Sequence, residues 1–456
     1  MNTPPSWQTT TSLLVPHPSL PAILLLAADD GWALPSFYAA ELRWAPEVEW
    51  LGPLWRERFG FPPIVLGCAW ADLDREQKIV DAILSLEAPP ADWPLPPGGR
   101  WVDRAQLADL TLARPAHLAA LGDHLAEAES GVIPEKRPPW ARPGWHDRAA
   151  AWIRRELETR GAAPTGPSQQ LKTWGISAIL RTPTEAGDYY FKVASQLPLF
   201  ADEPRVTAVL AARFPAHAPA PVAIERREQW MLLADFGPAL EDEADGAVWR
   251  ETLLAYGRMQ RAAEPLVDEL LAAGCLDRRL PVLADQITAL LRNDLALALL
   301  ADDERARIQA LLPEFLAVIG RLAERAIPET LVHGDCHSGN VAWRGGQPLI
   351  FDWTDACVAH PFMDAMCLLR GLPESFGAEE REGLRDAYLA LWGDAAAPER
   401  LREAWALCMA AEHLHQAVSY YHIVEAMEPR ARFEFDRAVP GHLRRALEAY
   451  EALPAS

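Results

Sequence analysis

The chain has 456 residues, of which half are hydrophobic and 23% are charged. This composition excludes a disordered chain and predicts about two to four domains of ordinary size. The formal net charge of −21 argues against nucleic acid and anionic membrane surfaces as partners, because phosphates carry the same sign. An acidic surface would suit a cationic substrate, but it also serves solubility alone, and we favour that plainer explanation.

The cysteines and the N-terminal residues indicate the compartment. The six cysteines include no Cys-x-x-Cys pair, so they predict neither a disulfide framework nor a zinc site. Prolines at positions 16, 18 and 21 interrupt the apolar run at 20–28, and no cationic stretch precedes it. We therefore expect no signal peptide, no membrane span and a cytoplasmic protein.

Proline-rich stretches at 89–99, 134–143 and 162–167 predict loops that divide the chain. Before the second of them, residues 1–140 are predicted to form an accessory α+β module. Strand-like runs at 64–70 and 79–86 come first in this module. The apolar spacing over 104–129 then predicts a helix.

From position 169 the pattern changes. It predicts short strands at 178–181, 189–193 and 230–234 and a helix at 203–214. Long amphipathic helices follow from position 247, with one β-like insertion at 331–352. We therefore predict an α+β protein in which a small β-rich lobe (141–235) precedes a large helical lobe (236–456).

The most informative motif lies in this β-like insertion. His333, Asp335 and Asn340 have the His-x-Asp-x-x-x-x-Asn spacing of a kinase catalytic loop, and Asp352 follows the apolar run 348–351. Phosphoryl transfer requires a carboxylate that orients and deprotonates the acceptor hydroxyl. It also requires oxygen ligands for the magnesium ion on the nucleotide phosphates.

The chain around this motif predicts a β-hairpin. Gly345 and Gly346 suit a two-residue turn, because glycine adopts positive φ at both positions. The expected cross-strand pairs are Trp343 with Pro348 and Val341 with Ile350. This register places Asn340 beside Asp352 at the open end of the hairpin, within reach of one ion. The combination of spacing, hairpin and second carboxylate disfavours a chance His-Gly-Asp triplet.

The run 333–352, together with Asp364 in the segment 360–365, resembles the aminoglycoside phosphotransferase and choline kinase-like families. The resemblance implies a protein-kinase-like fold that uses Mg²⁺ and ATP or GTP as the phosphoryl donor. It further implies that Asp335 is the catalytic base and that Asn340 and Asp352 are metal ligands. Asp364 would be a buried carboxylate that steadies the catalytic loop.

The nucleotide site is less sharply defined. Lys192 is the single lysine of an apolar strand, where burial without a charged partner is costly. The resemblance implies that Lys192 holds the nucleotide phosphates and pairs with Glu203, the first residue of the helix that follows. A lysine on the solvent side of an edge strand is the alternative for Lys192.

Three further features belong to the expected nucleotide site. No Gly-x-Gly-x-x-Gly loop precedes Lys192, so we expect the Gly175 amide and the Ser177 hydroxyl to cover the phosphates. Leu233 and Ala234 lie in the expected hinge, where the adenine would bond to the backbone, although an ordinary core strand is equally compatible. No Ala-Pro-Glu segment follows Asp352, which favours a small-molecule acceptor over a protein.

The acceptor region and the accessory module leave alternatives open. The polar and aromatic segment 412–422 either lines the acceptor pocket or packs its polar groups against other loops. Residues 21–130 faintly resemble a Nudix hydrolase through 31–35 and 99–103. Three of the four Nudix metal-site positions have lost their chemistry; the four residues are Pro53, Leu54, Glu57 and Arg58. The module is therefore either a degenerate Nudix-like domain or an unrelated α+β accessory domain.

The function predicted from the sequence is nucleotide-dependent O-phosphorylation of a small molecule with a hydroxyl group. Aminoglycosides, amino alcohols, sugars and nucleosides all remain possible acceptors, because fold does not choose substrate. A regulatory, nucleotide-binding pseudokinase is the alternative, and a binding-only protein would not need a base at Asp335. The residues lost from the Nudix positions argue against a Nudix hydrolase.

Overall fold

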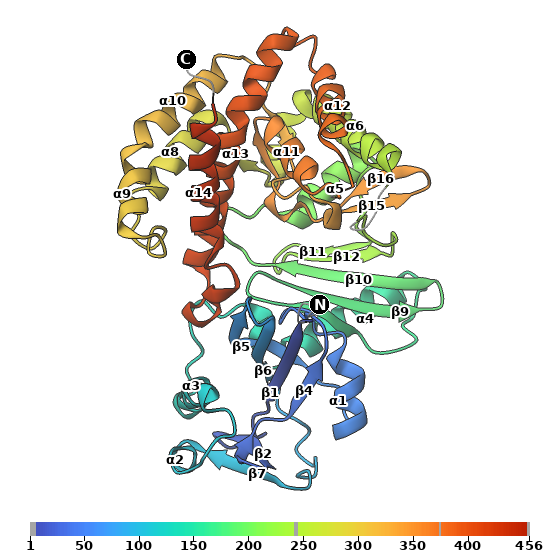
Figure 1. The fold of residues 1–456 in the computed structure, drawn as a ribbon. Coiled ribbons are helices and arrows are strands. Elements are labelled where there is room, and N and C mark those ends of the chain that lie inside the picture. Colours follow the sequence, from blue (N-terminus) through green and yellow to red (C-terminus); the bar gives the residue numbers. More distant parts are fainter. Residues whose placement is uncertain (1–5, 241–244, 374, 454–456) are drawn as a thin grey trace. The chain divides into compact units, whose positions relative to one another are not determined.

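The computed structural model describes residues 6–240, 245–373 and 375–453. The chain forms two compact units, which are treated separately here (Figure 1). The first unit comprises residues 1–195 and 427–434, and the second comprises residues 196–426 and 435–456. The three-part division at positions 140 and 235 stays a prediction.

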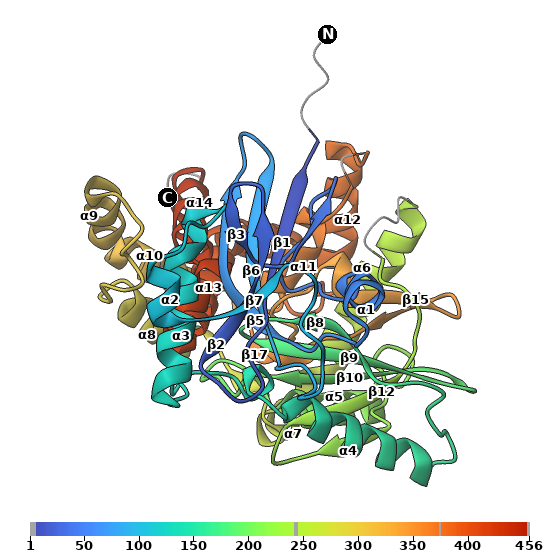
Figure 2. The ribbon, with the colours of Figure 1, turned by 90° about the horizontal axis from the view of Figure 1, so that it is seen from below.

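Two small sheets form the N-terminal part of the first unit (Figure 2). One has the strand order β4-β1-β6-β5 and the other the order β3-β2-β7. Strands β1 and β6 are parallel, and the other neighbouring pairs are antiparallel. The strands are β1 (Gln8–Leu14), β2 (Ala22–Ala28), β3 (Gly31–Ala33), β4 (Ser36–Ala39), β5 (Val65–Asp74), β6 (Ile79–Leu86) and β7 (Gly99–Asp103). Helix α1 (Leu51–Phe59) contributes the fully buried Trp55 to one of the two cores.

The strands expected at 64–70 and 79–86 are confirmed as β5 and β6, whereas the helix expected over 104–129 is wrong. The chain instead forms α2 (Arg104–Ala108) and α3 (Leu118–Ser130), with a 3₁₀ turn at Pro115–His117 between them. Pro115 has no N–H to continue a helix. Moreover, the backbone of this segment bonds to Trp32: the Thr111 carbonyl accepts the Trp32 N–H, and the Ala113 N–H donates to the Trp32 carbonyl, at 2.9 Å each.

The remainder of the first unit is an antiparallel meander with one helix. Helix α4 (Trp145–Thr159) precedes β8 (Gln169–Thr173), β9 (Ser177–Thr184) and β10 (Gly187–Ala194). The strands expected at 178–181 and 189–193 are confirmed, and each extends further than predicted. Two tryptophans of α4, Trp145 and Trp152, pack against Phe191 of β10, so the amphipathic face of α4 stabilises the meander.

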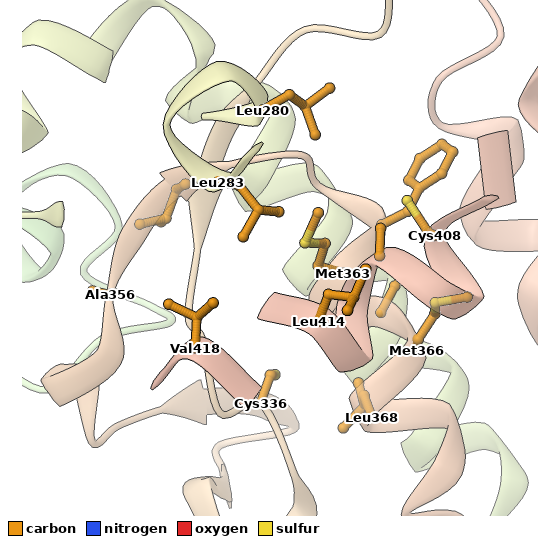
Figure 3. Packing of buried hydrophobic residues seen from close by; sticks show 14 of the residues in the cluster. Leu280, Leu283, Cys336, Ala356, Met363, Met366, Leu368, Cys408, Leu414 and Val418 are labelled. Carbon is orange, nitrogen blue, oxygen red and sulfur yellow. The ribbon is translucent and has the colours of Figure 1, made fainter. Parts of the chain in front are cut away.

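The second unit is mostly helical. Its helices are α5 (Glu203–Arg213), α6 (Gly246–Ala263), α7 (Val267–Ala273), α8 (Leu280–Leu290), α9 (Asp302–Ala310), α10 (Leu312–Ala323), α11 (Phe362–Arg370), α12 (Ala378–Ala390), α13 (Pro398–Ala426) and α14 (Ala438–Glu451). The longest, α13, is buried on most of its sides and runs beside α14 (Figure 1). Its residues Leu414 and Val418 enter the same core as Cys336 (Figure 3).

Short β elements interrupt these helices. Strands β11 (Ala223–Glu225) and β12 (Trp230–Ala234) form an antiparallel pair. A second sheet has the order β13-β17-β14, with β13 (Leu276–Asp277), β14 (Thr330–Val332) and β17 (Cys357–Ala359). The strand at 230–234 and the helix at 203–214 are therefore confirmed.

The predicted hairpin is present in the predicted register. Strands β15 (Val341–Arg344) and β16 (Gln347–Ile350) pair Trp343 with Pro348 and Val341 with Ile350. The turn glycines have φ of 60° and 79°, as a two-residue hairpin turn requires. Across the described ranges, no helix is both long and apolar enough to cross a membrane.

Candidate active site

The catalytic motif lies in the loop between β14 and β15, entirely within the second unit. Its N-terminal end follows the buried strand β14, and its C-terminal end is a short 3₁₀ turn at Ser338–Asn340. Between them, Cys336 is fully buried among helical side chains (Figure 3). The loop is thus anchored at both ends and in the middle, which limits its freedom to move.

A buried carboxylate holds the first residues of this loop. Asp364, in the first turn of α11, is 2% exposed. It accepts hydrogen bonds from the N–H groups of His333 and Gly334 and from the hydroxyl of Tyr256. Burial raises the pKa of this carboxyl group, and the hydrogen bonds it receives oppose the rise. Asp364 therefore fixes the loop backbone without facing solvent.

Both the backbone conformation and the neighbouring atoms at position 334 require a glycine. Its φ is 89°, and a Cβ at this position would collide with the carbonyl oxygen and side chain of Asp355. The Gly334 carbonyl accepts a hydrogen bond of 2.7 Å from Gln416 Nε2 of α13. Only glycine combines this backbone conformation with so close an approach.

His333 links the loop to the end of strand β16. Its ring is buried and lies 2.8 Å, through Nε2, from the carbonyl oxygen of Phe351. Its Nδ1 accepts the N–H of Asp335 at 3.3 Å. Since a carbonyl oxygen only accepts, Nε2 carries a proton in this arrangement. His333 thus connects Phe351, which precedes Asp352, with the backbone of Asp335.

The backbone of Asp335 is fixed, whereas its carboxylate is accessible. The Asp335 carbonyl accepts a 2.9 Å hydrogen bond from Asn340 Nδ2. The Asp335 side chain is 46% exposed, and its Oδ2 lies 3.5 Å from Nε2 of His337, which is itself 43% exposed. A carboxylate on a rigid backbone that reaches solvent has the geometry expected of a general base.

Asn340 and Asp352 lie at the open end of the hairpin, as predicted. The Phe351 N–H donates to the Asn340 carbonyl at 3.0 Å, which brings the two segments together. Asp352 has the left-handed angles φ 64° and ψ 61°, and its Oδ1 accepts from the Thr354 hydroxyl at 2.8 Å. This conformation is strained for a residue other than glycine and is typical of functional sites.

The donor set of this pair fits magnesium better than a transition metal. Asn340 and Asp352 offer hard oxygen ligands, and Mg²⁺ usually completes its shell with water and phosphate oxygens. Among the residues that the structure describes, no three His, Cys, Asp or Glu side chains form a group that could hold a metal ion. The roles of Asn340 and Asp352 as metal ligands stay a prediction.

Three of the residues expected at the nucleotide belong to the first unit. Lys192 lies in β10 opposite Ile179 and is 9% exposed. In the loop between β8 and β9, the Gly175 N–H donates to the Glu434 carboxylate at 3.0 Å. The Ser177 hydroxyl accepts from the Trp174 indole N–H at 2.5 Å. Both groups expected at the phosphates therefore have partners within the chain.

The other expected nucleotide residues belong to the second unit. Glu203 begins α5 and is 3% exposed, and Leu233 and Ala234 end β12, the first buried and the second exposed. Lys192 and Glu203 lie in different units, so their pairing stays a prediction. So does the adenine hinge at Leu233 and Ala234.

Several polar groups of segment 412–422 are engaged in internal contacts. Glu412 receives two hydrogen bonds from Arg370, at 2.6 and 2.8 Å. Although burial acts to raise its pKa, bonds from His413 and Arg370 lower it to about 2. Ser419 accepts a 2.5 Å hydrogen bond from the buried Arg278. For these residues the structure favours packing over an acceptor pocket.

Sequence reasoning missed one side chain that supports the loop, Tyr256 of α6, which donates to Asp364 and belongs to no motif. Gln416 of α13 lies in the segment 412–422, and its bond to the Gly334 carbonyl agrees with the alternative that this segment packs its polar groups against other loops.

The anchored loop, the hairpin and the helical unit around them define the class as kinase-like phosphotransferases. The phosphotransferase enzyme family (APH) matches residues 173–404, half of the chain. The chain therefore belongs to this family, whose members are kinases that phosphorylate hydroxyl groups of small molecules.

Several solved structures are similar to this chain at low sequence identity. Choline kinase from Cryptosporidium parvum is 10% identical, with a TM-score of 0.50 over 67% of this chain and 95% of that chain. A choline/ethanolamine kinase family protein from Mesorhizobium loti is 19% identical, with a TM-score of 0.47 over 68% of this chain and 95% of that chain. A spectinomycin phosphotransferase, solved with ADP and spectinomycin, is 13% identical, with a TM-score of 0.44 over 67% and 99%.

No curated protein matches the chain. The similarities found do not support the Nudix-like interpretation of the N-terminal module. That module is a β-rich region of unassigned type, and the kinase-like fold covers about two thirds of the chain.

Proposed function

We propose that this protein is a nucleotide-dependent O-phosphotransferase that transfers the γ-phosphoryl group of ATP or GTP to a hydroxyl of a small molecule. The observation that carries the proposal is the accessible carboxylate of Asp335 on a loop whose backbone is held by the buried Asp364. Positioning of the acceptor and stabilisation of charge supply most of the catalysis in phosphoryl transfer.

In this proposal Asp335 accepts the proton of the acceptor hydroxyl. The acceptor oxygen forms a bond to the γ-phosphorus while the bond from phosphorus to the bridging oxygen breaks, and the nucleoside diphosphate leaves. Asn340 and Asp352 would hold Mg²⁺, which when bound neutralises phosphate charge. Lys192 would bind the donor phosphates, with Glu203 as its partner.

The acceptor is proposed to be a small hydroxylated compound, with aminoglycosides and amino alcohols as the first candidates. The supporting observation is local charge: the acidic side chains in and near the loop include Asp335 and Asp355. These carboxylates favour an acceptor that carries a positive charge.

Release of ADP and GDP in the presence of magnesium tests the proposal. We would screen aminoglycosides, amino alcohols, sugars and nucleosides with the wild type and with Asp335→Asn. One compound should stimulate release at least ~100-fold more in the wild type than in the variant, as expected for a lost general base. Nucleotide binding without Asp335-dependent release for any compound would favour the regulatory pseudokinase, and failure to bind nucleotide would exclude both.

A further inference from the structure

A segment of the C-terminal region belongs to the first unit. Residues 427–434, which we call the strap, connect α13 to α14 but cluster with residues 1–195. The buried Arg137 donates to Glu428 of the strap at 2.6 and 2.9 Å, and it also pairs with Glu127. Phe433 of the strap packs against the core around Trp55. These contacts fix the strap on the first unit.

The strap touches the loop between β8 and β9 at Gly175. Glu434 Oε2 accepts the Gly175 N–H at 3.0 Å. On the same residue, a Cβ would collide with the end of the Met427 side chain and lie 3.1 Å from Glu434 Oε2. A side chain at position 175 would therefore displace the end of Met427, and the two groups that approach Gly175 come from the two ends of the strap.

The environment of Glu434 makes its charge sensitive to pH near neutrality. Burial raises its pKa to about 7, while the Gly175 N–H and the charge of Lys172 oppose the rise. The thiol of Cys68 in β5 also interacts with Glu434, and Cys68 is in turn affected by the charge of Arg430 in the strap. Burial also raises the pKa of Cys68, so its thiol stays neutral. Glu434 is thus the acid near Gly175 that changes charge between pH 6 and 8.

We propose that Glu434 is an internal ligand of the β8–β9 loop that competes with the donor phosphates for the Gly175 N–H. This inference rests on the proposed function and on the expectation from the sequence that the Gly175 N–H binds the donor phosphates. One N–H group donates one good hydrogen bond, so carboxylate and phosphate cannot both be satisfied. An ionised carboxylate beside the loop also repels the incoming phosphate charge.

The direction of the pH effect follows from the charge of Glu434. Below its pKa the group is neutral and repels phosphate least, so nucleotide binds most tightly there. As the pH rises through about 7 the carboxylate ionises and nucleotide binding weakens. Glu434→Gln keeps an oxygen that can accept the Gly175 N–H but removes the charge, so it should abolish this dependence.

Calorimetric titration with ADP in excess magnesium is the test, because ADP binds without turnover. At pH 8 we expect Glu434→Gln to bind ADP roughly fivefold to tenfold more tightly than the wild type. At pH 6 the two should agree within about twofold. The matched control is Glu129→Gln, which removes one charge from an exposed glutamate of the same unit and should follow the wild type at both pH values.

The second readout is the number of protons taken up when ADP binds. If Glu434 becomes protonated when phosphate binds, the wild type should take up a fraction of a proton from the buffer near pH 7.5, more than Glu434→Gln does. Titrations in buffers of different ionisation enthalpy measure this uptake, and the difference cancels the titration of ADP itself.

Each outcome decides the proposal. Equal or weaker binding of ADP by Glu434→Gln at pH 8, or equal proton uptake in the two proteins, would overturn the competition and leave Asp335-dependent transfer untouched. Absence of ADP binding in every variant, including at pH 6, would overturn the proposed function as well.

Discussion

Two loops of this protein use the same interaction with different consequences: a carboxylate that is buried in one case and half-buried in the other accepts backbone N–H groups. In the second unit, Asp364 binds the N–H groups of His333 and Gly334, and the next side chain, Asp335, is left accessible. In the first unit, Glu434 binds the N–H of Gly175, the group that the sequence predicts for phosphate. A carboxylate bonded to a loop can therefore either support a catalytic site or occupy a phosphate site, depending on which N–H group donates to it.

The largest expected effect is on kcat, from substitution of the accessible carboxylate of the catalytic loop. Asp335→Asn should lower kcat by at least ~100-fold, because the amide cannot accept the proton of the acceptor hydroxyl. The affinity for ADP should change little, since Asp335 is not assigned to the nucleotide. Initial rates of ADP release, with ADP titration as the control, would check this. Similar losses of kcat and ADP affinity would instead indicate a structural role.

The next prediction removes the supporting carboxylate of the same loop. Asp364→Ala removes the carboxylate that accepts from His333, Gly334 and Tyr256, and only the His333 N–H keeps another acceptor, the Tyr256 hydroxyl oxygen at 2.9 Å. We expect the free energy of unfolding to fall by about 3 kcal/mol, measured in urea. Asp364→Asn, which keeps one acceptor oxygen, should lose less. Equal stability of Asp364→Ala and the wild type would show that Asp364 does not hold the loop.

Alanine substitutions at two glycines distinguish the cost of a positive φ from the cost of a steric collision. Gly334→Ala combines a positive φ with a collision against the Asp355 backbone, whereas Gly345→Ala meets no atom within 4 Å and has a φ of 60°. We expect a loss of stability of more than ~2 kcal/mol for Gly334→Ala and about 1 kcal/mol for Gly345→Ala. Thermal unfolding of both variants gives the difference, and equal losses would contradict the tight fit at Gly334.

The smallest expected effect is a pH dependence of stability from Glu434. Its folded pKa of about 7 lies above the ordinary value of 4.5, so its stabilising contribution is complete below pH 4.5 and is lost as the pH rises through 7. Relative to the wild type, Glu434→Gln should therefore gain stability between pH 5 and pH 8, by roughly 2 °C in Tm. Parallel Tm curves for the two proteins would show that Glu434 does not titrate in this range.

Sequence patterns within short segments were enough to predict many of the secondary-structure elements. The hairpin register followed from Gly345 and Gly346, and the strands at 79–86 and 230–234 followed from short apolar runs. The helix over 104–129 failed because its apolar spacing was read without Pro115 and without the pairing of 111–113 to Trp32. The roles of Asp335, Asn340, Asp352 and Lys192 stay predictions until activity is measured.

By itself, the sequence determined the catalytic motif, the hairpin that carries it and the family, because these depend on spacing within a few dozen residues. Only the tertiary structure decided what holds each loop. Gly334 is bonded to Gln416 from 82 positions away, and Gly175 to Glu434 from 259 positions away. Such partners depend on how helices and strands pack, and no local period or motif in the sequence specifies which distant carboxylate or amide will reach a given N–H or carbonyl group.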